Sequence, residues 1–179
     1  MSIQKAAVAV LVVLMICVAE AAGGKGVHSS AQFHFSAEDA GVGKPVSIPE
    51  DVLAALRMDE TIRSAMANEN ISSEKIPPSW LSASAIHLST PEKSDLVVMA
   101  EGPLKGSNVT TFWVFCATAH GYRLALTAPA HDLLVMSVSW KGYRNIELKS
   151  ITAAQISTVL LRFDGELYKE AQVESEPIQ

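Results

Sequence analysis

Residues 110–117 read Thr-Thr-Phe-Trp-Val-Phe-Cys-Ala, and this run decides the fold class. Aromatic and β-branched side chains favour strands, and here they follow one another without polar alternation. A strand that is apolar on both sides needs cover on both faces. The run therefore predicts a central strand with another layer packed over it, and residues 95–100 have the same character.

Further strand-like runs surround these two, with turn residues between them. The hairpin turn signals are Asp164-Gly165 and Lys141-Gly142, and Gly165 is expected to take a positive φ angle. The succession predicts an antiparallel β-meander of about seven or eight strands. The candidate strands are residues 83–88, 95–100, 110–117, 122–127, 133–140, 144–149, 157–163 and 167–169.

A helical pattern precedes the strands. Val52, Leu56 and Ile62 recur at helical spacing, Pro49 suits a first turn, and Asp59 offers a second start. This segment has the apolar face needed to cover the two-sided strands. We therefore expect an α+β fold in which an N-terminal helical segment packs on one face of the meander.

The N-terminus is typical of a cleaved signal peptide over residues 1–21. Lys5 gives a positive n-region, residues 6–19 are apolar, and Ala19-Glu20-Ala21 offers a cleavage site. An uncleaved anchor is the alternative. After cleavage we expect no membrane span, and a secreted or periplasmic protein. The remaining divisions are a flexible leader at 22–47 in which residues 33–35 could dock as a short strand, a single α+β domain at 48–172, and a frayed tail at 173–179.

Charge and composition exclude several classes of function. The net charge is −5 and the basic residues are scattered, which argues against nucleic acid as a partner. The five histidines show no zinc-binding spacing, and His120 and His131 are expected to be solvated in turns. Cys116 lies in the apolar run, where burial makes a thiol inert. We expect no catalytic residue, no metal and no cofactor.

Two enzyme alternatives stay open. A small secreted hydrolase could use a Cys116/His131 dyad, or a pair of carboxylates from different elements. Most of the candidate acids begin strands or sit in turns, where a carboxylate simply suits the backbone. They are Asp95, Glu101, Asp132, Glu147 and Asp164. In addition, residues 95–99 (Asp-Leu-Val-Val-Met) are echoed by residues 132–136 (Asp-Leu-Leu-Val-Met), as an internal repeat or by coincidence.

The residues that favour binding are Trp140, Tyr143 and Arg144, which lie around one tight turn. Trp, Tyr and Arg are enriched at interaction hot spots. Alternation in residues 144–149 favours exposure of Tyr143 and Trp140, and inward packing of the two rings is the alternative. The sequence thus predicts an exported, non-catalytic binding or inhibitor-type domain of the bacterial periplasm or cell exterior, with another exported or envelope protein as partner. A hydrolase, or an envelope structural or assembly protein, is the alternative.

Overall fold

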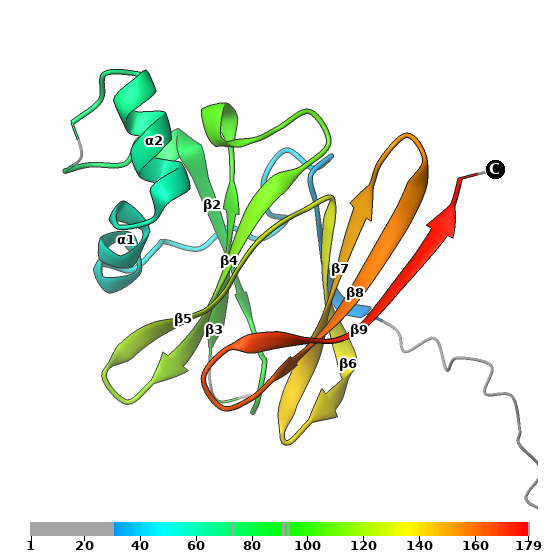
Figure 1. The fold of residues 1–179 in the computed structure, drawn as a ribbon. Helices are drawn as coiled ribbons and strands as arrows, with labels where there is room; N and C mark the ends of the chain where they lie inside the picture. Colours follow the sequence, from blue (N-terminus) through cyan, green and yellow to red (C-terminus); the bar gives the residue numbers. More distant parts are fainter. Residues whose placement is uncertain (1–30, 73, 91, 93, 179) are drawn as a thin grey trace, which may run out of the picture.

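Two antiparallel sheets form the body of the computed structural model, which describes residues 31–178 except 73, 91 and 93 (Figure 1). The expected signal peptide, residues 1–21, lies outside the described residues. The four-stranded sheet has the order β2 (Leu81–Ile86), β3 (Asp95–Ala100), β4 (Thr110–Thr118) and β5 (Gly121–Ala130). The five-stranded sheet has the order β1 (Ala31–Ser36), β6 (Asp132–Trp140), β7 (Tyr143–Ile151), β8 (Gln155–Phe163) and β9 (Tyr168–Pro177).

The single meander expected from the sequence is corrected by this topology. The chain makes two consecutive meanders, β2 to β5 and β6 to β9, and the second lies against the first. The physical reason lies in β4, which is buried on both sides. Phe112 and Val114 face the core between the sheets, and Trp113 and Phe115 face the core beneath the helices. Cys116 is 4% exposed in the first of these cores, so its expected burial is confirmed.

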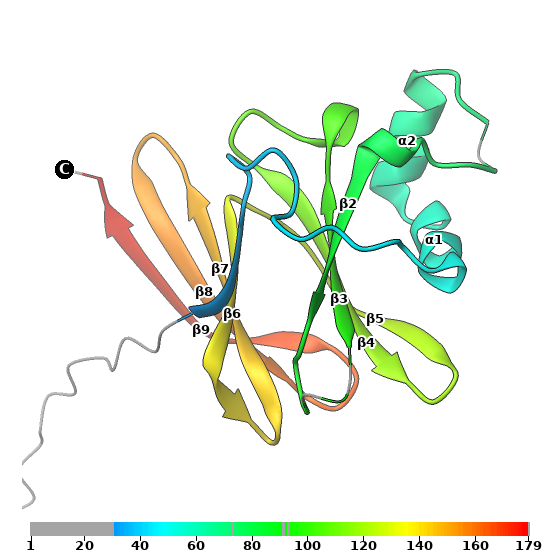
Figure 2. The same ribbon diagram turned by 180° about the vertical axis from the view of Figure 1, so that it is seen from behind.

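The two helices, α1 (Glu50–Arg57) and α2 (Glu60–Asn68), cover the outer face of the four-stranded sheet (Figure 2). Packing of a helical segment on one face is therefore confirmed. Asp59 accounts for the start of α2 because its Oδ1 accepts hydrogen bonds from the Thr61 and Ile62 amides. Its Oδ2 accepts one from the Trp113 indole at 2.9 Å. Two short 3₁₀ turns, η1 (Pro78–Trp80) and η2 (Gly102–Leu104), complete the elements. No helix among the described residues has the length and apolar character needed to cross a membrane.

The segment expected as a flexible leader, residues 22–47, is described from residue 31 onward. Ala31–Ser36 forms β1, which pairs with β6 and so confirms the short strand considered around residues 33–35. Phe35 is 6% exposed in the core between the sheets, and Phe33 packs against that core. Two aromatic rings on one face are enough to extend the sheet by a strand, despite the glycines around them.

The expected frayed tail at 173–179 is also corrected. β9 continues to Pro177 and pairs with β8 along its whole length, from Phe163↔Tyr168 to Gln155↔Pro177. Apart from the buried Tyr168, its residues are exposed. An edge strand is held by its backbone ladder and needs little apolar burial, so a polar sequence does not prevent it from forming.

Both hairpin turns are confirmed. Gly165 has φ 118°, and in the β6–β7 turn Lys141 has φ 49° and Gly142 has φ 82°. The Asp164 carboxylate accepts hydrogen bonds from the Glu166 and Leu167 amides, each at 2.9 Å. In the β6–β7 turn, the positive φ angles of Lys141 and Gly142 are the geometry that suits a two-residue hairpin loop.

The two echoing sequences occupy matching positions in the two sheets. β3 begins at Asp95 and lies between β2 and β4, and β6 begins at Asp132 and lies between β1 and β7. Their carboxylates have different roles, however. Asp95 is 1% exposed and binds backbone amides, whereas Asp132 lies 3.1 Å from Nε2 of His34.

Candidate binding surface

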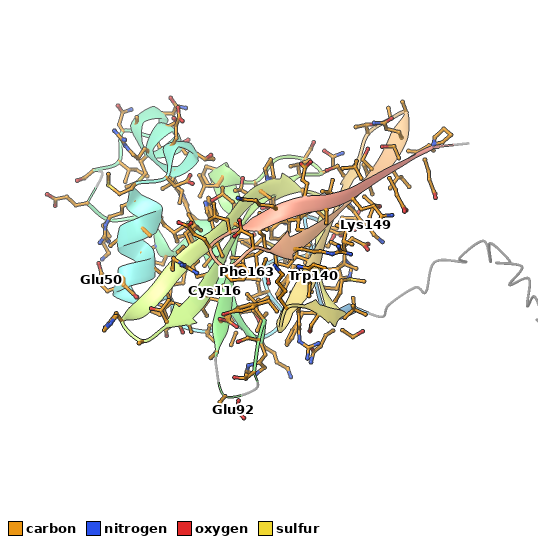
Figure 3. All side chains as sticks on the ribbon, turned by 60° about the horizontal axis from the view of Figure 1, so that its bottom comes forward. Glu50, Glu92, Cys116, Trp140, Lys149 and Phe163 are labelled. Atoms are coloured by element: carbon orange, nitrogen blue, oxygen red, sulfur yellow. The ribbon has the colours of Figure 1, made fainter. Side chains whose placement is uncertain are left out.

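Trp140 ends β6 at the tip of the β6–β7 hairpin and offers an exposed indole. It is 43% exposed. The Arg162 guanidinium from β8 lies 4.6 Å from the centre of the ring, and Nζ of Lys141 lies 6.0 Å from it. Figure 3 labels Trp140 well away from Glu50 of α1, at the other side of the molecule. The indole is thus held by a cation on one side while much of its surface stays open to solvent.

Tyr143 packs inward, and its expected exposure is wrong. It is the cross-strand partner of Trp140, but its ring lies 4.3 Å from that of Phe163 and packs against the core between the sheets. The expectation takes residues 144–149 as alternating between two faces, but the adjacent Asn145 and Ile146 of β7 are both buried, so the alternation does not extend to Tyr143. The pairing with β6 is irregular in the same region, with a register shift between Val135 and Ser139.

Arg144 has a structural environment. Its Nη1 donates to the Ser137 carbonyl at 3.2 Å and the Met136 carbonyl at 3.4 Å, within the irregular part of β6. Its backbone amide donates to the Leu88 carbonyl at 2.6 Å, and its carbonyl accepts from the Tyr168 hydroxyl at 2.9 Å. Its side chain is held by carbonyls of the neighbouring strand β6, and its backbone amide joins β7 to the chain that follows β2, so we assign Arg144 to the fold.

The exposed surface therefore consists of residues that the sequence indicated only in part. Val138, two positions before Trp140, is 49% exposed, and with Lys141 and Arg162 it completes what we call the Trp140 patch: Val138, Trp140, Lys141 and Arg162. Lys141 was visible as part of the turn. Arg162 comes from another strand, and only the pairing of the sheet brings it over the indole.

The Cys116/His131 dyad is excluded by the positions of the two residues. Cys116 pairs with Arg123, while His131 follows the other end of β5, where Ala130 pairs with Thr110. At about 3.3 Å per residue they are roughly 20 Å apart. His131 is also 7% exposed rather than solvated, since its Nδ1 lies 2.9 Å from the Asn108 carbonyl at the junction of the sheets.

None of the five candidate acids is paired with another of them, because each carboxylate contacts a group that is not an acid. The Asp95 carboxylate accepts hydrogen bonds from the Leu88 and Ala117 amides, both at 2.8 Å. Asp164 caps its turn and lies 2.7 Å from Lys169. The others are Glu101 with Ser82 at 2.9 Å, Glu147 with Lys149 at 3.7 Å, and Asp132 with His34 at 3.1 Å. In the described part of the chain, no three His, Cys, Asp or Glu side chains gather in a way that could hold a metal ion.

Tyr168 links the β6–β7 hairpin to the core between the sheets through a phenol with a raised pKa. Burial raises the pKa of Tyr168 above its ordinary value, and electrostatic interactions with the nearby Cys116 and Asp95 raise it further. The protonated hydroxyl donates to the Arg144 carbonyl. The folded protein therefore retains this proton at pH values where the unfolded chain releases it.

We predict that this phenol makes the protein sensitive to alkali. Its contribution to stability is fully present below the ordinary tyrosine pKa of about 10 and is lost as the pH rises above it. Tyr168→Phe keeps the ring but removes the titration. The free energy of unfolding in urea, measured at about pH 8 and about pH 10.5, should fall more for the wild type than for Tyr168→Phe. Equal falls would contradict the assignment.

Comparisons with protein-family models, with curated proteins and with solved structures found no match to this chain. The fold and the surface thus define a two-sheet α+β protein with an exposed aromatic and cationic patch on a rigid hairpin.

Proposed function

We propose that this chain is an exported, non-catalytic binding domain, and that the Trp140 patch is its contact surface. The partner is another exported or envelope protein that presents carboxylates around an apolar spot. Export is supported by the signal-like sequence of residues 1–21. The observation that carries the binding proposal is the exposed indole held beneath the Arg162 guanidinium.

The environment of the patch suits recognition. A tight hairpin on a sheet fixes the ring, so little conformational freedom is lost when a partner covers it. Arg162 and Lys141 add two cations beside the ring, in a protein whose net charge is −5. A carboxylate-bearing partner would be attracted to this local positive charge, while Val138 and the indole supply the apolar centre that hot spots require.

The test compares variants that leave the core intact. The chain without residues 1–21 is immobilised and exposed to exported proteins, and bound partners are identified by mass spectrometry. We expect Trp140→Ala to weaken the binding of a true partner by ~2 kcal/mol, which raises its Kd about 30-fold. The melting temperature of this variant should stay close to that of the wild type. Arg162→Glu should weaken it as well, because it reverses the charge over the ring.

Met58→Ala is the matched control. Met58 is 73% exposed on the helical side of the molecule, between α1 and α2, so it reports non-specific apolar adsorption. A partner bound through the patch is kept by Met58→Ala and lost by the other two variants. Partners retained equally by all variants would contradict the proposal, as would unfolding of Trp140→Ala.

A further inference from the structure

The outer edge of β9 is open in the described part of the chain. β9 ends the five-stranded sheet, and among the described strands its backbone pairs only with β8. In Figure 1 it is the outermost ribbon of its sheet, and its arrowhead points away from the four-stranded sheet. The β2 edge, in contrast, is covered by the preceding chain, since Pro45 bridges to Ser84 and the Val46 amide donates to the Ala83 carbonyl. An uncovered edge presents backbone groups that a further strand can pair with.

In the second half of β9, the acidic side chains lie on one face of the strand. A register shift sets residue 171 out of step with β8, and from Gln172 to Pro177 the pairing is regular. Gln172, Glu174 and Glu176 then share a face, and Nε2 of Gln172 donates to Oε1 of Glu174 at 2.6 Å. On the other face Val173 is 56% exposed. The edge therefore offers carboxylates at alternate positions and an apolar side chain between them.

Symmetry argues against a second copy of this chain as the added strand. If two copies of β9 paired in antiparallel fashion about a two-fold axis, each residue would lie opposite a residue of the second copy whose side chain is on the same face of the sheet. In the two longest such registers of residues 172–177, Glu174 faces either itself or Glu176 of the second copy. Like charges directly opposite one another are destabilising in a sheet. The edge therefore disfavours self-association and favours a strand of opposite charge.

We propose that β9 accepts, by strand addition, an extended segment of a different protein that carries Lys or Arg at alternate positions and apolar residues between them. The backbone ladder would supply affinity, and the cations opposite Glu174 and Glu176 would supply specificity. This edge is independent of the Trp140 patch. The edge suits a basic partner segment, whereas the Trp140 patch suits a partner that presents carboxylates.

The test uses a blocked, fluorescent peptide of seven alternating Lys and Val residues, titrated against the chain without residues 1–21 by anisotropy. We expect saturable binding that weakens about tenfold or more in Glu174→Gln/Glu176→Gln. The matched control is Glu60→Gln/Glu69→Gln, which removes the same charge from exposed positions of α2 and its C-terminal cap and should bind as wild type.

Two further probes separate strand addition from simple charge attraction. One peptide is N-methylated on every Lys and the other on every Val, so the charge is unchanged. In a paired strand the amides of alternate residues face opposite edges, so one methylated peptide should bind like the parent and the other should lose binding. No parent binding, equal behaviour of both methylated peptides, unaltered binding to the Glu174→Gln/Glu176→Gln variant, or a dimer of the chain that the peptide dissociates would each overturn the proposal.

Discussion

Asp95→Ala is expected to lower the free energy of unfolding by roughly 3–5 kcal/mol, because it leaves one buried and one partly buried amide without an acceptor. Asp95 is 1% exposed, and its two carboxylate oxygens accept from the Leu88 and Ala117 amides. These amides belong to the loop after β2 and to β4, on either side of β3. A single side chain therefore joins three consecutive segments of the four-stranded sheet. Urea unfolding followed by tryptophan fluorescence measures the loss.

Asp132→Ala is the matched control, since Asp132 begins the echoing strand β6. Its side chain is 15% exposed, but its carboxylate pairs with His34, whose side chain is 55% exposed, and a pair that reaches solvent in this way contributes little. We expect a loss below about 1 kcal/mol. Similar losses at the two positions would mean that the Asp95 hydrogen bonds do not hold the sheet as described.

The sequence predicted those parts of the fold that depend on neighbouring residues. The two-sided burial of β4 followed from its unbroken apolar run, and the turns at Gly142 and Gly165 followed from the residue types that tolerate positive φ. The helical spacing of the apolar residues around Val52 and Ile62 predicted the helices that cover the four-stranded sheet. Each of these features is encoded within about ten residues, so local rules were sufficient.

The errors arose where distant segments decide the structure. The division into two sheets depends on which strands meet, and the strand pattern is the same for one meander or two. Glycines and charges around Phe35 and Val173 suggest flexible ends, with at most a short strand at residues 33–35. Pairing with β6 and β8 orders both segments. At the β6–β7 hairpin, Tyr143 packs against the core although simple alternation predicts its exposure, and Arg144 donates to backbone carbonyls in the irregular part of β6.

Phe35→Ala is expected to destabilise the protein by about 3–5 kcal/mol, the range for deleting a buried aromatic ring. Phe35 is 6% exposed and lies in the core between the two sheets, opposite Leu133 on β6. The cavity would open where the five-stranded sheet contacts its neighbour, so the loss should also weaken the pairing of β1. Urea unfolding gives the free energy, and faster amide hydrogen exchange in β1 would locate the damage.

His34→Ala on the same strand separates burial from mere position in the sequence. His34 points away from the core, and its 55% exposed side chain contacts Asp132 at the solvent surface. Because a strand alternates its faces, the two neighbouring substitutions should differ several-fold in cost, with His34→Ala below about 1 kcal/mol. If Phe35→Ala were as mild as His34→Ala, β1 would contribute little to the core, and residues 31–36 would behave as the flexible leader that composition suggested.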